Sequence, residues 1–279
     1  MPRRFGLRHS LVIIWTIGWS DFLLKYRGSV LGYFWSLVSP LVKFVVMLHV
    51  FHPFVGQTIP NYSLYLLLGI IIWEHFCYTT SGCMTMLFDK SEVIQRLPFP
   101  RLLLILIVGW TQAIVFCSHV LIFLFFAWTK GVPFTADILY LPVLLLQMSL
   151  FALGVGMFLS AYCLRFRDIA HLWDIGLQVL FWLTPIAYAY NGQGPLVTDA
   201  MRTFSRMTDL SIHTILELFI RFKPLSVLIN DARRSALYST IVGGPSLPHA
   251  IVITVFCAAV FTLGATVFQR RSRYFLQEY

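Results

Sequence analysis

Long stretches without a formal charge recur along the chain. Four of these intervals are 102–129, 138–164, 175–198 and 247–269. Each is long enough to cross a bilayer, because a membrane-spanning helix needs about 20 apolar residues that rise about 1.5 Å each. The pattern predicts an integral membrane protein built from helices.

A further apolar region lies between Lys43 and Glu74, where the segment HPFVGQTIPNY interrupts it. Proline, glycine and asparagine in that segment indicate a turn between two spans. The predicted fold class is therefore an all-α integral membrane protein, with residues 1–279 in a single transmembrane domain. We expect six transmembrane helices, near 30–51, 62–86, 102–128, 138–163, 172–190 and 249–268.

The remaining segments of this domain flank the spans. Residues 1–29 contain an apolar run, 11–19, that is too short to span, so we expect a cytoplasmic interfacial helix before the first crossing. Residues 30–190 hold the first five spans, and 248–279 hold the sixth span and a cytoplasmic tail. Segment 191–247 is expected to form outer amphipathic helices, either a re-entrant pair that gates an exit or a solvated hairpin.

Two amphipathic stretches support this view of the outer segment. The apolar face of the first consists of Ile212, Ile215, Leu216, Phe219 and Ile220. The apolar face of the second consists of Leu225, Leu228, Ile229 and Ala232, and its polar face is expected to carry Asn230, Asp231, Arg233 and Arg234.

Composition and charge agree with a membrane protein. The chain is 58% hydrophobic and 12% charged, with a formal net charge of +9. Lysine and arginine concentrate on the side that contains the N-terminus, so the positive-inside rule places both termini in the cytoplasm. Basic flanks of this kind lie against anionic lipid, and we expect no nucleic-acid partner.

Two ions interrupt the apolar spans. Lys43 lies midway along the first predicted span and Glu74 midway along the second. Because a lone charge at that depth costs roughly 2.5–3.5 kcal/mol, we expect the two to pair with each other or to line a wet conduit. Two roles stay open for this pair: a purely structural role, and a role in handling substrate or protons.

Aromatic side chains add further candidates for a conduit, since their faces suit the apolar faces of sugar rings. Others of the same kind lie in interfacial belts or pack between helices. The residues that we select as conduit candidates, with the two ions, are Tyr33, Trp35, Lys43, Trp73, Glu74, Trp182 and Tyr188.

Motifs for catalysis are missing from the sequence. It contains no GxxxxGK[ST] phosphate loop, no HExxH and no paired Cys/His cluster, so we expect no catalytic or metal site. The small residues of GVG at 154–156, and the pair Gly28 and Gly32, are interpreted as helix-packing positions.

Four stretches carry a resemblance to a known family. They are KYRGSVLGYFWSLVSPL (25–41), KSEVIQRLPFPR (90–101), FRDIAHLWDIGLQVLFWLTPIAY (166–188) and, more loosely, KPLSVLINDARRSALY (223–238). In this order they resemble the permease subunits of ABC exporters for O-antigen and wall teichoic acid polysaccharides. The resemblance implies a homodimer in the bacterial inner membrane with two cytoplasmic ATP-binding subunits. It also implies a lipid-linked polysaccharide as cargo, typically on undecaprenyl diphosphate. ATP and Mg would then bind the partner ATPase, and this chain would hold no cofactor.

The resemblance also assigns roles to two cytoplasmic segments. In that family, the loop between the second and third spans is a coupling helix that docks in the ATPase. Here Ser91 is a suitable N-cap and Glu92 suits the positive helix start. The coupling residues implied are Ser91, Glu92, Val93, Ile94, Gln95 and Arg96, with a second contact at Arg165, Arg167 and Asp168.

The turn after the N-terminal helix looks like the family's gate for lipid entry. Lys25, Tyr26 and Arg27 form this gate, where the two cations would bind a lipid diphosphate. Ordinary positive-inside anchoring is the competing explanation for these cations.

Other functions stay open at this stage. A permease of the same class would also suit a capsular polymer, teichoic acid, a lipid or a drug. A membrane enzyme that acts on polyprenyl-linked sugars and an ion-coupled carrier that uses Lys43 and Glu74 are the alternatives from other classes.

Overall fold

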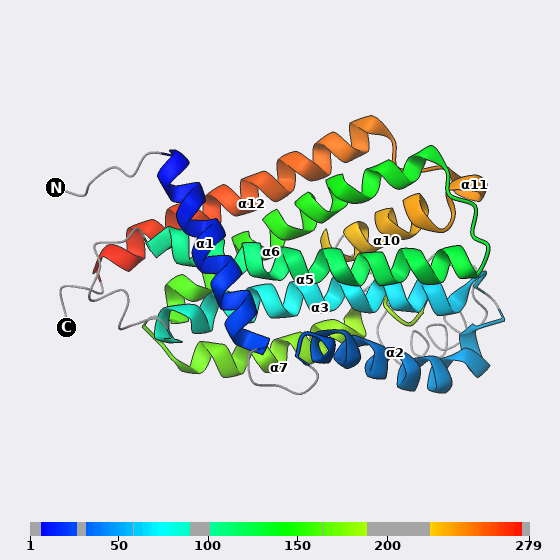
Figure 1. Cartoon of the computed structure of the whole chain (residues 1–279), viewed down its shortest axis with the longest axis horizontal. Helices are drawn as coiled ribbons and strands as arrows, with labels where there is room; N and C mark the ends of the chain where they lie inside the picture. Colours follow the sequence, from blue (N-terminus) through cyan, green and yellow to red (C-terminus); the bar gives the residue numbers. More distant parts are fainter. Residues whose placement is uncertain are drawn as a thin grey trace, which may run out of the picture.

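A computed structural model describes residues 7–26, 32–57, 59–89, 101–163, 165–188 and 224–274. Helices form nearly all of these ranges, which contain no strand (Figure 1). The elements are α1 Leu7–Tyr26, α2 Phe34–Val55, α3 Tyr62–Asp89, α5 Arg101–Thr129, the 3-10 helix η1 Ala136–Tyr140, α6 Leu141–Cys163, α7 Asp168–Leu183, α10 Pro224–Ala236, α11 Ser239–Val242 and α12 Leu247–Tyr274.

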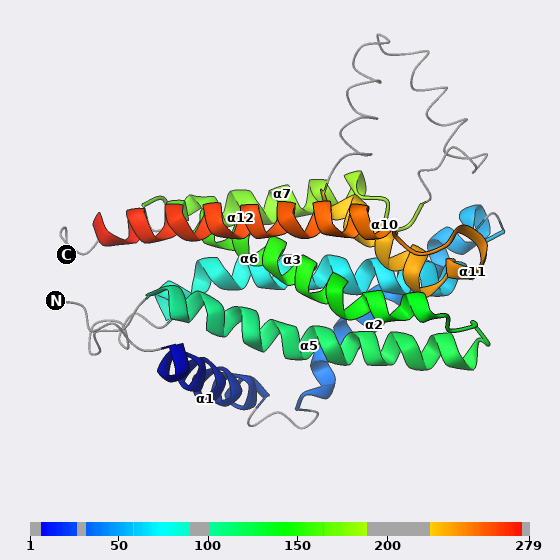
Figure 2. The ribbon, with the colours of Figure 1, turned by 90° about the horizontal axis from the view of Figure 1, so that it is seen from above.

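Helix α3 is the centre of the bundle. It contacts α2, α5, α6, α7 and α10, while α12 packs on the far side of α6 (Figures 1 and 2). Its outer half is apolar on nearly all sides, and the residues between Leu64 and Phe76 are all buried. A helix enclosed by protein in this way also tolerates the polar residues Glu74 and His75, because neither meets lipid.

Four helical segments are long and apolar enough to cross a membrane, among the residues that the structure describes. They are Phe34–Val55, Arg101–Thr129, Ala136–Cys163 and Leu247–Ser272. Helix α3 has 28 residues but carries more polar side chains, and α7 has only 16 residues. The structure thus supports four of the six predicted crossings by length and composition.

Helix α6 packs closely on two neighbours through glycine, as the GVG motif predicts. A Cβ at Gly154 would lie 2.7 Å from the backbone of Val260 and Phe261 on α12. A Cβ at Gly156, on another face, would lie 2.8 Å from Cys83 Sγ on α3. These glycines let three helix backbones approach one another.

The packing role predicted for Gly32 is wrong. This residue has φ 49° and lies in a turn, one residue before Tyr33, the N-cap of α2. The first predicted span therefore begins about one turn too early, because glycine here supplies a left-handed turn and ends the N-terminal connection.

The fifth predicted span, 172–190, is also shorter than expected. Helix α7 ends at Leu183, and Thr184 is extended with φ −96° and ψ 131°. The cause is Pro185, since proline disfavours helical geometry in the residue before it.

Helix α10 confirms the apolar face expected for the second amphipathic stretch and contradicts its polar face. Leu225, Leu228 and Ile229 are buried, but Asp231 and Arg233 are also only 3% and 2% exposed. A solvated helix is thus excluded for α10. Its polar side chains find partners inside the protein, whereas the first amphipathic stretch lies outside the described residues.

Helix α1 lies across the bundle instead of running along it (Figures 1 and 2). It packs on α5 through Gly18, where a Cβ would lie 2.6 Å from the Trp110 ring. Trp15 contacts the same ring in a tilted arrangement, with centroids 4.9 Å apart and an interplanar angle of 45°. Large apolar side chains cover the rest of α1 and are exposed: Leu11, Val12, Trp19, Leu23 and Leu24.

Candidate functional site: a groove between α2, α3 and α7

A groove of about 530 Å³ lies between α2, α3 and α7. Its walls are mainly aromatic and aliphatic, with only two polar side chains, Lys43 and Gln178. Phe51 and Trp182 face each other across it, with ring centroids 6.3 Å apart. The lining residues are Lys43, Val46, Met47, Val50, Phe51, Trp73, Leu177, Gln178, Phe181 and Trp182.

The predicted pairing of Lys43 with Glu74 is confirmed. Lys43 Nζ lies 2.9 Å from Glu74 Oε1. The lysine side chain is 43% exposed, whereas that of the glutamate is 3% exposed. Lys43 Nζ also lies 6.0 Å from the centre of the Phe181 ring. The ion pair thus joins the lightly buried helix α2 to the core helix α3, beside the groove.

Helix α7 adds a polar stripe that was missed in the sequence analysis. His171, Asp174 and Gln178 are all exposed and follow one another at i, i+3 and i+7, which places them on one face. Gln178, the last residue of this stripe, lines the groove together with Lys43. This spacing of polar residues within an apolar segment is visible in the sequence and is the signal that was overlooked.

The polar stripe shows what this face of the protein can contact. Ionisable residues at membrane depth face a protein interior or a water-filled cavity, because hydrocarbon does not solvate them. Lys43 and Asp174 are exposed in the isolated chain. Within a bilayer, these two ions would require water or another protein surface beside them instead of lipid.

Exchanging the two charges tests the ion pair. We expect Lys43→Glu and Glu74→Lys alone to lower the amount of folded protein in membranes, because each leaves two like charges together at low dielectric. The double variant should recover most of the loss, as measured by fluorescence-detected size exclusion in mild detergent. A double variant no better than the single ones would contradict an energetic role for the pair.

The other predicted conduit residues fall into two groups. Trp73 and Trp182 line the groove, and Tyr188 lies beside it, donating a hydrogen bond of 3.0 Å to the carbonyl of Trp182. Tyr33 and Trp35 are not among the lining residues. Tyr33 instead contacts Ser118 Oγ on α5, and Trp35 is 55% exposed at the start of α2.

A non-helical turn, 184–188, closes the outer end of α7, and side chains bind its carbonyls one after another. Arg233 donates to the carbonyls of Pro185 at 2.7 Å and Ile186 at 2.9 Å. The hydroxyls of Tyr62 and Tyr65 on α3 donate to the next two carbonyls, of Ala187 and Tyr188, at 2.8 and 2.9 Å. Buried backbone groups must be paired in this way, so the turn is rigidly held.

Arg233 also binds α3 directly. Its Nε and Nη2 donate to the carbonyl of Tyr65 at 3.3 and 3.2 Å, and its guanidinium stacks 3.3 Å above the Tyr65 ring. A Cβ at Gly69 would lie 2.6 Å from Arg233 Nη2, so glycine provides the space for the guanidinium. Arg233 thus fixes the outer end of α7 to α3, next to Trp182 in the groove.

A second buried contact ties α10 to α12. His249 Nε2 lies 2.8 Å from Asp231 Oδ2. Burial raises the pKa of the Asp231 carboxyl, and the contact with His249 acts in the opposite direction. The polar side of α10 is thus an anchoring surface.

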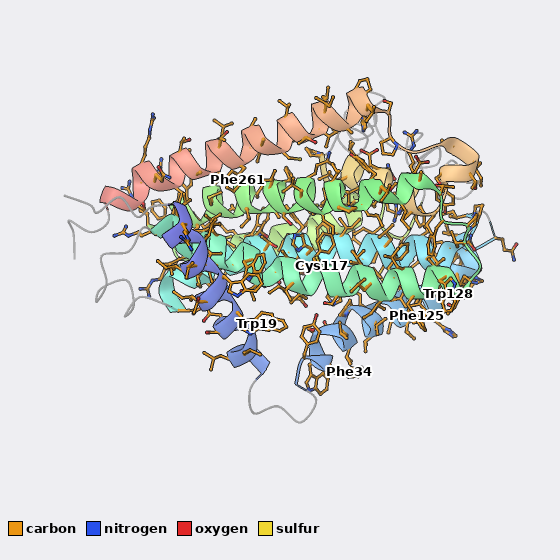
Figure 3. The ribbon with its side chains drawn as sticks, turned by 45° about the horizontal axis from the view of Figure 1, so that its top comes forward. Trp19, Phe34, Cys117, Phe125, Trp128 and Phe261 are labelled. Carbon is orange, nitrogen blue, oxygen red and sulfur yellow. The ribbon has the colours of Figure 1, made fainter. Side chains whose placement is uncertain are left out.

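The predicted entry gate lies at the end of α1. Lys25 and Tyr26 belong to the last turn of that helix, and Arg27 lies outside the described residues. Figure 3 shows Trp19 on α1 and Phe34 on α2 on the same side of α5, which carries the exposed Cys117. The gate assignment itself stays a prediction.

The two predicted ATPase contacts differ in what the structure reveals. Residues 91–96 lie outside the described part of the chain. Arg165 and Arg167 lie in the connection between α6 and α7, Asp168 begins α7, and all three are exposed. The Arg165 guanidinium lies 5.3 Å from the Phe166 ring centre. Their exposure leaves them accessible to a partner.

Comparison with known proteins gives a consistent result. The sequence profile of the ABC-2 type transporter family matches residues 13–208. The O-antigen export system permease protein RfbA of Klebsiella pneumoniae is 25% identical over 190 residues, which cover 68% of this chain and 73% of that protein. The protein of the same name from Myxococcus xanthus is 27% identical over 164 residues, covering 59% of this chain and 63% of that protein.

Proposed function

Because the chain belongs to the ABC-2 type transporter family, we propose that it is the permease of an ATP-driven exporter for lipid-linked polysaccharide, such as O-antigen on undecaprenyl diphosphate. The observation that carries the cargo class is the groove between α2, α3 and α7. It combines aromatic faces, which suit sugar rings, with hydrogen-bonding groups and an ion pair at membrane depth. The names of the similar O-antigen permeases support the same cargo.

In this proposal the exporter is a homodimer. The α2–α7 face of each copy either contacts the other copy or lines the path between the two copies. A second copy on this face would shield Lys43, Asp174 and Gln178 from lipid and enclose a continuous polar path. The two copies supply six crossings each in the bacterial inner membrane, with α3 and α7 as crossings in addition to the four apolar helices. Both termini are cytoplasmic, as the distribution of basic residues suggests.

Energy comes from two cytoplasmic ATP-binding subunits, which hold the ATP and Mg. The sequence of this chain has no phosphate loop, in keeping with a transport subunit that carries out no chemistry. Residues 91–96 and the exposed connection 165–168 contact those subunits. Closure of the ATPase pair moves these segments and, through α3 and α7, the walls of the groove.

The cargo enters beside α1. Lys25 and Arg27 bind the diphosphate at the cytoplasmic interface, and Tyr26 lies between them. The exposed aromatic and aliphatic side chains of α1 contact the lipid tail. From there the sugar chain passes along α2 into the groove.

Affinity purification tests the assignment. A tagged chain purified from native membranes in mild detergent is expected to bring down an ATP-binding subunit in a one-to-one ratio, as measured by quantitative mass spectrometry. Reversing two coupling charges, Glu92→Arg with Arg96→Glu, should reduce that yield at least about tenfold, because like charges then face each other at the docking site.

The matched control reverses a charge outside both proposed contacts. Lys130 lies at the end of α5, on the side opposite the predicted ATPase contacts. The variant Lys130→Glu should leave the yield of the ATP-binding subunit unchanged. Failure of the intact chain to retain any ATP-binding subunit would contradict the exporter. Equal loss in the Lys130→Glu control would show that the coupling assignment is wrong.

A further inference from the structure

The helices around the groove reverse the charge balance of the chain. The whole chain has a net charge of +9, with 21 lysines and arginines against 12 carboxylates. Helices α2, α3 and α7 together contain one lysine, no arginine and four carboxylates, a net charge of −3. Two of these carboxylates, Glu74 and Asp174, lie near the groove, whereas Asp89 is the last residue of α3 and Asp168 is the first residue of α7.

The positions of these charges leave the groove without a net positive charge. The lysine is Lys43, and Glu74 lies 2.9 Å from its ammonium, so the pair is neutral. Asp174 is exposed one turn before Gln178, which lines the groove. The same face also carries His171 on the α7 stripe and the hydroxyls of Ser39 and Tyr78, whose oxygen atoms are 3.5 Å apart.

We infer that the groove selects polysaccharides whose repeat units carry no negative charge. This inference rests on the proposed function. Asp174 does not line the groove but lies one turn from Gln178, which does. A carboxylate beside a narrow path in a low-dielectric surrounding repels anions by the same electrostatics as the charged side chains of ion-selective pores. In a dimer, symmetry brings a second Asp174 and a second neutral ion pair to the same path, so the negative charge beside the path is doubled.

Aromatic faces and amide or hydroxyl groups are the complementary features for neutral sugars. Trp182, Phe51 and Phe181 provide the faces, and Gln178 can both donate and accept a hydrogen bond. The diphosphate of the lipid carrier passes this face once for each chain, whereas every repeat unit must pass it. Charge on the repeat unit therefore dominates the rate.

Export of two matched polymers tests the inference. Proteoliposomes with the permease and its ATPase receive undecaprenyl-diphosphate-linked chains of equal length, one of neutral hexoses and one with a uronic acid in each repeat. We expect ATP-dependent export of the neutral chain to be about tenfold faster, the lower end of electrostatic effects in charged clefts. Asp174→Lys should bring the two rates to within about twofold.

The control adds the same charge away from the groove. Thr240→Lys on the exposed surface of α11 should keep the preference for the neutral chain. Equal export of both chains by the native protein would overturn the inference while leaving the exporter intact, as would a preference that Asp174→Lys does not alter. Export of neither chain would contradict the proposed function and the inference with it.

Discussion

Replacing Arg233 with methionine is expected to lower the Tm of the purified protein by roughly 10 °C. Methionine fills much of the same volume but leaves the carbonyls of Pro185 and Ile186, in the non-helical turn, without the arginine donor. An unpaired buried group costs about 1–3 kcal/mol, so two of them cost at least about 2 kcal/mol. Differential scanning fluorimetry in detergent measures the change.

The neighbouring arginine is the matched control for this experiment. Arg234 makes a long hydrogen bond of 3.5 Å to the carbonyl of Gly244 and an electrostatic interaction with Asp231, and it is half-buried. Arg234→Met should shift Tm by no more than about 2 °C, within the usual range for surface substitutions. Equal losses in the two variants would show that the carbonyl contacts of Arg233 do not stabilise the outer end of α7.

Replacing Gly264 with leucine is expected to prevent the packing of α12 onto α6. A Cβ at Gly264 would meet the carbonyl oxygen of Gly154, and a Cβ at Gly154 would meet the backbone of Val260. Overpacking against flexible side chains costs about 1–3 kcal/mol, and backbone atoms cannot move aside as side chains do. We therefore expect little or no monodisperse protein by size exclusion for Gly264→Leu and for Gly154→Leu.

A glycine with free space shows whether the effect is specific. A Cβ added at Gly176 on α7 would lie 4.0 Å from its nearest neighbouring atom, which belongs to Trp173. Gly176→Ala should retain the full yield and gain up to about 1 kcal/mol from the helix preference of alanine. Normal folding of Gly264→Leu would contradict the close backbone contact.

The helices and the ion pair were accessible from sequence because they depend on local pattern. Apolar runs set the positions of α5, α6 and α12, and equal depth along adjacent antiparallel spans brought Lys43 opposite Glu74. The polar stripe of α7 was also accessible in principle. Its spacing at His171, Asp174 and Gln178 is a helix period in a segment that was treated only as a span.

The burial of Arg233 could not be predicted in this way. An amphipathic pattern separates apolar from polar side chains, but it does not distinguish a polar face in water from one that binds protein carbonyls. The carbonyls become available only because Pro185 ends α7 early, and they lie 48 and 47 residues before Arg233 in the chain. This site depends on a long-range arrangement that local periodicity does not contain.

The space beside Gly69 carries an evolutionary consequence. A guanidinium at 233 needs glycine at 69, because a Cβ there would lie 2.6 Å from its Nη2 atom. We therefore expect the residues at 69 and 233 to vary together among related proteins, although 164 residues separate them.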